Sequence, residues 1–139
     1  MPTMRKRRFF KMLLGIAAAA PVGARALVAP AAPRVQPILL QRSPVAGFQY
    51  HQGESVWTEL RPGAELSLRR EPVNCYDARA VEILWQDHKL GYLPRAENTT
   101  IASLLDKGET LTARIEQLQD SVQPWQRVKV ELWLWPDAM

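Results

Sequence analysis

Four side chains of different chemistry lie within eight consecutive residues near the middle of the chain, at Arg70, Asn74, Tyr76 and Asp77. They supply a cation, an amide, a phenol and a carboxylate. An ionised carboxylate accepts a hydrogen bond from a hydroxyl group and repels a phosphate. Turns on a β scaffold often carry binding residues, but asparagine and aspartate are also ordinary turn residues. The spacing alone therefore leaves two interpretations, a binding turn and a purely structural one.

Segments with the pattern of β-strands flank this turn. Residues 64–70 alternate, with Leu66 and Leu68 on one face, which is typical of a half-buried strand. Residues 80–85 and 89–93 predict a hairpin around Gln86-Asp87-His88. The remaining predicted elements are strands at 45–50, 56–60, 110–118 and 127–135, a turn at 61–63 and an edge strand at 38–40.

One helix is predicted, over residues 97–107. Ile101, Leu104 and Leu105 have helical spacing, and Gly108 stands where a helix commonly ends. Several short strands with one inserted helix indicate a mostly β fold, either a small barrel or a sandwich. The roughly 95 residues that remain after the N-terminal segments are enough for one modest core.

The first 26 residues have the three parts of a secretory signal. A basic region that contains Arg7-Arg8 precedes the apolar run 12–20, and Ala24-Arg25-Ala26 fits a cleavage site. The arginine pair favours twin-arginine export, with ordinary secretion as the alternative. The apolar run is shorter than the about 20 residues that a membrane helix needs. We therefore expect an exported protein, periplasmic or secreted, that is not an integral membrane protein after signal removal.

The mature chain lacks a general positive charge. Residues 1–26 contain six of the 18 basic residues and none of the 14 acidic ones, which leaves a net charge of −2. This balance excludes a basic field over the whole protein, so a polyanion would have to bind a local patch. The single cysteine, Cys75, excludes an internal disulfide. The expected organisation is a Pro-rich linker at 27–43, a domain at 44–135 and a tail at 136–139.

Two motifs together give the chain a resemblance to a known family. They are Arg-Glu-Pro-x-Asn-x-Tyr-Asp-x-x-Ala-Val at residues 70–81 and Gly-Tyr-Leu-Pro-Arg at residues 91–95, with Val45 to Gly53 upstream. They resemble the HIRAN domain, which occurs in helicase-like remodellers and as a stand-alone bacterial domain. The resemblance covers residues 43–135. It implies a small antiparallel barrel of about six strands, related to OB and SH3 barrels, with one or two short helices.

The resemblance also implies a ligand, the 3′-hydroxyl end of single-stranded DNA or another nucleic acid. It implies that Asp77 accepts a hydrogen bond from the free hydroxyl, that aromatic side chains stack on bases, and that basic residues neutralise phosphates. The chain departs from the family pattern at Gln49, His51 and Arg79. The full set of implied nucleic-acid-binding residues is Gln49, Tyr50, His51, Arg70, Asn74, Tyr76, Asp77, Tyr92 and Arg95.

Other chemistry has little support in the sequence. His51, His88 and Cys75 lack the spacing of metal ligands, and the chain contains neither a phosphate-binding glycine loop nor a recognisable nucleophile motif. We therefore predict a binding module without catalysis, cofactor or metal. The alternative is an exported barrel that binds an envelope protein or another ligand. Trp133 and Trp135 would form an apolar patch for such a partner if their strand face is exposed.

Overall fold

The computed structural model describes residues 35–137, so the signal expected at residues 1–26 lies outside the described residues. The strands are β1 (Ile38–Pro44), β2 (Glu65–Arg70), β3 (Val81–Trp85), β4 (His88–Tyr92), β5 (Thr110–Leu118) and β6 (Val128–Trp135). The helices are α2 (Gly53–Val56) and α3 (Thr99–Asp106), with 3-10 turns at Phe48–Tyr50, Trp57–Glu59, Arg95–Glu97 and Pro124–Gln126. The predicted mostly β fold is confirmed. Within residues 35–137, no helix has the length and apolar character needed to span a membrane.

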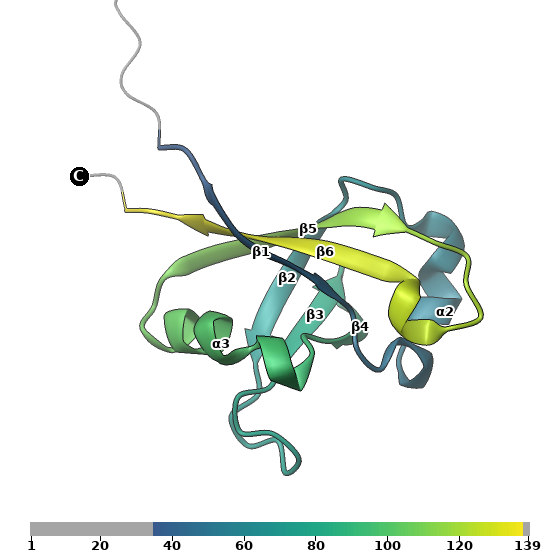
Figure 1. Cartoon of the computed structure of the whole chain (residues 1–139), viewed down its shortest axis with the longest axis horizontal. Coiled ribbons are helices and arrows are strands. Elements are labelled where there is room, and N and C mark those ends of the chain that lie inside the picture. The colour runs from purple at the N-terminus through teal and green to yellow at the C-terminus, as the bar shows by residue number, and fades with distance from the viewer. Residues whose placement is uncertain (1–34, 138–139) are drawn as a thin grey trace, which may run out of the picture. The chain divides into compact units, whose positions relative to one another are not determined.

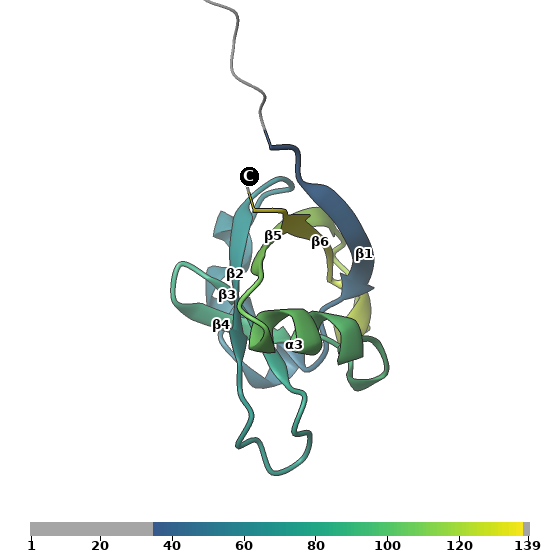
Figure 2. The same cartoon turned by 90° about the vertical axis from the view of Figure 1, so that its left-hand side faces the viewer.

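The six strands form one antiparallel sheet in the order β1-β6-β5-β2-β3-β4. The sheet curls round its core, so that the two edge strands face each other (Figures 1 and 2). Ala46, which follows β1, pairs with Tyr92 of β4 through two backbone hydrogen bonds of 2.8 and 2.9 Å. This bridge joins the two edges at one point, and the result is a partly open barrel.

Alternating side chains fill the barrel. Val128, Val130 and Leu132 of β6 are each at most 1% exposed, as their spacing predicts. Ile101 of α3 is fully buried, and α3 lies across one side of the curled sheet (Figure 2). Phe48 is also fully buried and meets Trp57 edge to face, with ring centroids 5.9 Å apart. One core therefore extends from α3 to the segment that follows β1.

Helix α3 ends at the glycine that the sequence indicates. Gly108 has a φ of 82°, a left-handed conformation that favours glycine. The N–H groups of Gly108 and Glu109 donate to the carbonyl oxygens of Leu105 and Leu104, each at 3.0 Å. This pair of bonds is the Schellman arrangement that closes a helix. The helix predicted over residues 97–107 is confirmed as Thr99–Asp106, while Glu97 belongs to the 3-10 turn Arg95–Glu97 that precedes it.

Two predicted strands are wrong. Residues 45–50 do not continue as a strand, because Gly47, with a φ of 74°, turns the backbone after the Ala46 bridge. Residues 56–60 form the end of α2 and a 3-10 turn. The apolar residues Val56 and Leu60 are both buried and lie four positions apart, a spacing that puts two residues on one face of a helix and of a strand alike, so the pattern did not distinguish the two.

The first strand begins inside the segment expected to be a linker. β1 spans Ile38–Pro44 and pairs with β6 along most of its length. The edge strand expected at residues 38–40 is therefore present and longer than predicted. The hairpin between β3 and β4 is also confirmed, and its two turn residues, Gln86 and Asp87, both have positive φ. Such two-residue turns match the twist of antiparallel strands.

Candidate ligand-binding site

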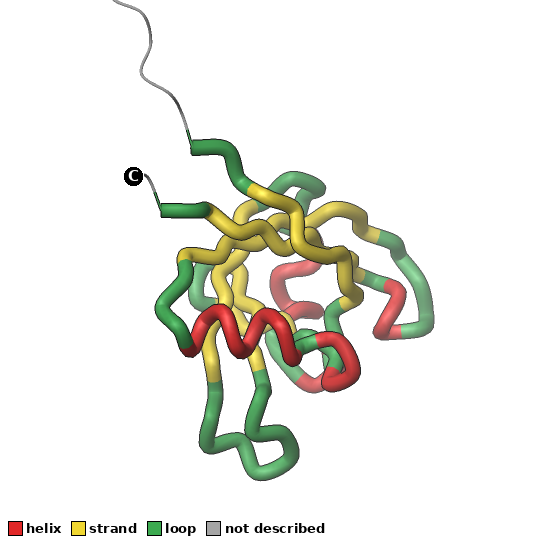
Figure 3. Tube along the Cα trace, turned by 60° about the vertical axis from the view of Figure 1, so that its left-hand side comes forward, coloured by secondary structure: helices red, strands yellow, loops and turns green. Residues whose placement is uncertain are grey.

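A long loop between β2 and β3 carries the residues of the first motif and projects from the sheet (Figure 3). The N–H of Glu71 donates to the carbonyl oxygen of Ala80 at 3.0 Å and closes the base of the loop. Arg70 donates to the carbonyl oxygens of Ala78 and Ala80 and forms an ion pair with Asp106 of α3 at 2.8 Å. The guanidinium of Arg70 therefore braces the loop against α3.

Asn74 organises the tip of this loop. Its Oδ1 accepts hydrogen bonds from the backbone N–H groups of Tyr76 and Asp77, at 2.8 and 3.0 Å. Its Nδ2 donates to Oε1 of Glu71 at 2.6 Å. The structural interpretation of the turn thus holds for Asn74, whose side chain fixes the backbone. One consequence is that the side chain of Tyr76 stands 83% exposed.

Asp77 is held in place without being enclosed. Its Oδ1 accepts the backbone N–H of Arg79 at 2.9 Å, and its Oδ2 accepts Nδ2 of Asn98 at 2.7 Å. The Arg79 hydrogen bond lowers the pKa of the Asp77 carboxyl, and burial opposes this shift, while Asn98 and the charge of Arg95 reinforce it. Because a carboxylate has about four acceptor positions, both oxygens can still accept from a ligand.

The side chain of Asp77 lines a cavity of about 270 Å³, which we call the Asp77 cavity. Arg95, in the 3-10 turn before α3, is exposed and forms no ion pair with any residue in the described part of the chain. A carboxylate and an unpaired cation therefore face the same space. The residues that line this cavity are Ala46, Asn74, Tyr76, Asp77, Ala80, Tyr92, Leu93 and Arg95.

A larger hollow of about 630 Å³ shares Asn74, Tyr76 and Tyr92 with the Asp77 cavity, and we call it the tyrosine hollow. Tyr50 and Tyr76 are 78% and 83% exposed in its lining. Exposed aromatic rings offer flat apolar faces on which planar ligand groups can stack. The other lining residues are Gly47, His51, Glu71, Val73 and Cys75, whose thiol is free and exposed.

Tyr92 joins the two hollows through a network of hydrogen bonds. Its hydroxyl donates to Oε1 of Glu71 at 2.9 Å and accepts from Nζ of Lys89 at 2.6 Å. Nζ of Lys89 lies 3.3 Å from Oε1 of Glu82 and 3.8 Å from Oε2 of Glu71. The pKa of Glu71 falls to about 2: the neighbouring Glu82 side chain contributes most, the hydrogen bonds from Asn74 and Tyr92 and the charge of Lys89 add to the shift, and burial opposes it. The carboxylate of Glu71, which lines the tyrosine hollow, is therefore ionised at neutral pH.

Seven of the nine predicted site residues come together around these two hollows: Tyr50, His51, Asn74, Tyr76, Asp77, Tyr92 and Arg95. His51 meets Tyr92 edge to face at 5.6 Å, and burial followed by the Lys89 charge lowers its pKa. Gln49 is exposed and lines neither hollow. Arg70 also lines neither, since it braces the loop.

The sequence reasoning missed several residues that shape the site. Asn98 precedes α3 and would be assigned as a helix cap, yet its side chain makes no capping bond and donates to Asp77. Glu71 lies within the first motif and Lys89 just before the second, but their network depends on the pairing of β3 with β4. Within residues 35–137, no group of three or more His, Cys, Asp or Glu side chains could hold a metal ion.

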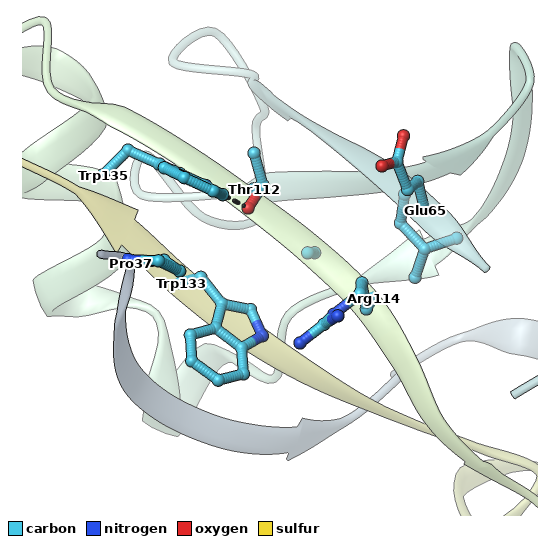
Figure 4. A pocket seen from close by; sticks show the side chains of 8 residues that line it. Pro37, Glu65, Thr112, Arg114, Trp133 and Trp135 are labelled. Carbon is cyan, nitrogen blue, oxygen red and sulfur yellow. Dashed lines mark hydrogen bonds between the residues drawn. The ribbon is translucent and has the colours of Figure 1, made fainter. Parts of the chain in front are cut away.

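A separate groove lies on the outer face of β5 and β6 (Figure 4). Trp135 is 38% exposed, and its Nε1 donates to Oγ1 of Thr112 at 2.9 Å. The guanidinium of Arg114 lies 5.0 Å from the ring centre of Trp133. Trp133 and Trp135 thus lie together, as expected for their strand face. They line a cavity of about 230 Å³ with Pro37, Glu65, Leu66, Thr112, Ala113 and Arg114.

Comparison with known proteins identifies relatives of this fold. The sequence pattern of the HIRAN domain matches residues 38–135. A crystal structure of a protein from Lactobacillus plantarum is 31% identical, covers 73% of this chain and 97% of its own, and has a TM-score of 0.64. The HIRAN domain of human HLTF is 17% identical, with coverages of 71% and 78% and a TM-score of 0.56. The latter likeness concerns the fold alone.

A curated relative is much longer than this chain. The Fanconi-associated nuclease 1 homolog of Oryza sativa subsp. japonica is 34% identical over 67 residues. The match covers 45% of this chain and 6% of the nuclease homolog. The similarity therefore concerns one small part of that protein.

Proposed function

This chain belongs to the HIRAN domain family, and we propose that it is a nucleic-acid-binding module that captures the 3′-hydroxyl end of single-stranded DNA. Membership in the family supports a nucleic-acid-binding module rather than an enzyme. The observation that carries the finer proposal is the position of Asp77, a held but accessible carboxylate in a cavity beside two exposed tyrosines.

The chemistry of the Asp77 cavity favours a free hydroxyl end. A carboxylate that keeps acceptor positions can bond a sugar hydroxyl, and it repels a phosphate at the same place. A continuing strand or a 3′-phosphate would bring such a charge against Asp77. The low pKa of Asp77 keeps the carboxylate ionised at neutral pH. Selection for a strand end thus follows from one charged group.

The tyrosine hollow suits the bases of such a strand. Stacking of a base on an aromatic side chain contributes about 1–3 kcal/mol and tolerates any base. Tyr50 and Tyr76 are exposed enough to offer their ring faces without leaving a core. We therefore expect affinity for a short strand to come mainly from stacking, and preference for its 3′ end to come from Asp77.

The test is fluorescence anisotropy with short labelled strands that end in a 3′-hydroxyl or a 3′-phosphate. The native chain should bind the hydroxyl end more tightly. Asp77→Asn should weaken that binding about tenfold, because a hydrogen bond to a charged group is stronger by about 1–1.5 kcal/mol than one to a neutral group. Binding of the phosphate end should not weaken, since the repulsion is removed.

The Asp77→Asn variant should fold normally. Its side-chain oxygen can keep the Arg79 N–H, and Asn98 has a buried Oδ1 without a partner among the described residues, which can accept from the new amide. Asp87→Asn is the matched control, since Asp87 lies in the exposed β3–β4 turn and asparagine tolerates its positive φ. Equal binding of both strand ends by the native chain would refute the proposed selection.

We also propose that the protein works outside the cytoplasm, on the strength of the signal pattern in residues 1–26. Fractionation of cells that express the full chain should recover it in the periplasm or medium, and Arg7→Lys with Arg8→Lys should retain it inside if export uses the twin-arginine route. Retention of the native chain in the cytoplasm would contradict the proposal.

A second candidate function is the binding of an envelope protein or another ligand by the same scaffold. The groove between Trp133 and Trp135 favours it, because paired indoles beside an arginine suit a partner surface. Trp135→Ala should then reduce recovery of a partner from the envelope fraction, while Asp77→Asn should not. Recovery of nucleic acid alone would count against this function.

A further inference from the structure

We propose that a polar cavity at the end of β5 and β6 binds a sugar unit that carries a carboxylate, of the uronic acid type. The cavity has a volume of about 230 Å³ and shares no lining residue with the Asp77 cavity or the tyrosine hollow. We call it the Trp125 cavity. This inference goes beyond the proposed capture of a strand end and does not depend on it. The side chains that carry the argument are those of Gln117, Gln119, Trp125, Gln126 and Lys129, all of which line the cavity.

A bulge in β5 turns the glutamines of this cavity outward. Ala113 and Ile115 are buried, so strict alternation would also turn residue 117 towards the core. The register shifts between Ile115 and Gln117, and Gln117 pairs with Lys129 of β6. Gln117 is therefore exposed, as is Gln119, which lies two residues further along. Bulges re-aim side chains in this way and are common beside functional sites.

The amide groups of the Trp125 cavity are available to a ligand. Within residues 35–137, the side chains of Gln117 and Gln119 form no hydrogen bond with the protein, and both are exposed. Gln126 accepts a hydrogen bond from Oγ of Ser121 at its Oε1, at 2.9 Å, and keeps its Nε2 as a donor. Each amide group carries both donors and an acceptor, and a hydroxyl group likewise donates and accepts. Neighbouring amides therefore match the neighbouring hydroxyls of a sugar ring.

The ring of Trp125 supplies an apolar wall. Trp125 is 57% exposed and lies in the 3-10 turn Pro124–Gln126, within the connection between β5 and β6 that passes beside α2 (Figure 1). Arg127, which follows this turn, pairs with Glu54 of α2, and its guanidinium lies 4.1 Å from the ring centre of Trp57. The turn is therefore held against the barrel. An exposed indole offers a flat apolar face, on which the carbon-bound hydrogens of a sugar ring can pack.

The charge of the cavity favours an acidic sugar. Of the described residues that line it, Lys129 alone carries a charge, and it forms no ion pair within residues 35–137. An ammonium group without a neighbouring carboxylate attracts an anionic ligand. An extended peptide fits this place less well, because such peptides add to a free sheet edge, whereas β5 and β6 bond to each other here as far as Leu118 and Val128.

NMR titration with trigalacturonate, and with maltotriose as the neutral counterpart, tests this inference. The side-chain amide signals of Gln117 and Gln119 should shift, and the native chain should bind trigalacturonate more tightly than maltotriose. Trp125→Ala should weaken binding of both about tenfold, because one ring face leaves the contact. Lys129→Gln should weaken binding of trigalacturonate about two- to fivefold, as expected for an exposed ion pair, and should leave that of maltotriose unchanged.

Trp135→Ala and Lys107→Gln are the matched controls, because both residues are exposed and lie outside the Trp125 cavity. Both variants should bind as the native chain does. Equal losses in Trp125→Ala and Trp135→Ala, or no binding of trigalacturonate by the native chain, would overturn this inference while the proposed function stood. Displacement of trigalacturonate by single-stranded DNA would also overturn it, because the cavity would then belong to the path of the strand. Failure of the native chain to bind single strands would overturn the proposed function alone.

Discussion

A single methyl group added at Gly91 should separate two parts of the site, Tyr92 on β4 and the segment after β1 that carries Tyr50 and His51. Gly91 precedes Tyr92 on β4 and faces the segment that leads to Tyr50 and His51. A Cβ at Gly91 would lie 2.3 Å from the carbonyl oxygen of Ala46 and 2.7 Å from Cγ1 of Val45. The nearer atom belongs to the backbone, so a side-chain rotation cannot relieve the contact. Gly91→Ala must therefore push residues 45–46 away from β4.

The size of the effect follows from these distances. Ordinary contact begins near 3.4 Å, so the two backbones must separate by about 1 Å. The Ala46–Tyr92 hydrogen bonds, now 2.8 and 2.9 Å, would lengthen to about 3.8 Å or more and break. Two lost bonds cost about 1–3 kcal/mol, and partial exposure of the fully buried Val45 adds about 1–2 kcal/mol. We expect Gly91→Ala to lower the free energy of unfolding by about 2–5 kcal/mol.

Urea denaturation followed by tryptophan fluorescence measures this change. Gly63→Ala is the control, because Gly63 also has a positive φ, of 88°, but a Cβ added there would meet no atom within 4 Å. This variant should lose only about 1–2 kcal/mol of unfolding free energy, from backbone strain alone. A loss below about 0.5 kcal/mol in Gly91→Ala would refute the view that this close approach holds the barrel together. Folded Gly91→Ala protein should also bind single strands more weakly.

Three further predictions concern the site. Tyr50→Ala and Tyr76→Ala should each weaken binding of a single strand by about 1–3 kcal/mol in anisotropy assays. Because both side chains are exposed, the midpoint of unfolding should stay unchanged, and a shift in that midpoint would indicate a structural role. Asn98→Ala should raise the pKa of Asp77, since the carboxylate loses a hydrogen bond that favours its charged form, and an NMR titration that found the same pKa would show that this bond is absent in solution. The pKa of Glu71 is about 2 in the folded chain, against an ordinary value of 4.5. The contribution of this group to stability should therefore be complete above about pH 4.5 and should disappear as the pH falls towards 2. Glu71→Gln should flatten the pH dependence of the urea midpoint in that window, and an unchanged dependence would contradict the lowered pKa.

Alternation in β2 and β6 and the apolar run of β3 made most of the strands predictable. β5 was predicted with its observed ends, and β2, β3, β4 and β6 were placed within one residue of them. The two errors lie in the segment between β1 and β2, where Phe48, Val56 and Leu60 are buried by turns rather than by a strand. Short helical turns leave too few residues for a 3.6-residue period to be recognised. Only the packing of this segment against the barrel decides its conformation.

The sequence by itself determined the kind of site. The types and spacing of Asn74, Tyr76 and Asp77 indicate a turn with an acceptor and a ring, because local hydrogen bonds and side-chain chemistry depend on near neighbours in the chain. The family resemblance assigned Arg70 to the ligand, however, and the residue pattern left the contact of Asn98 with Asp77 unnoticed. Those roles depend on how α3 and the β4 edge lie against the loop.

Only the tertiary structure decided which polar groups remain free. Arg70 and Arg79 look alike in the sequence, yet one is bonded to α3 and the other faces solvent beside Asp77. The partner of Arg70 is 36 residues away along the chain, and that of Asp77 is 21 residues away. Contacts over such separations exist only after the sheet has formed and α3 has packed against it, because folding brings together groups that no local pattern relates.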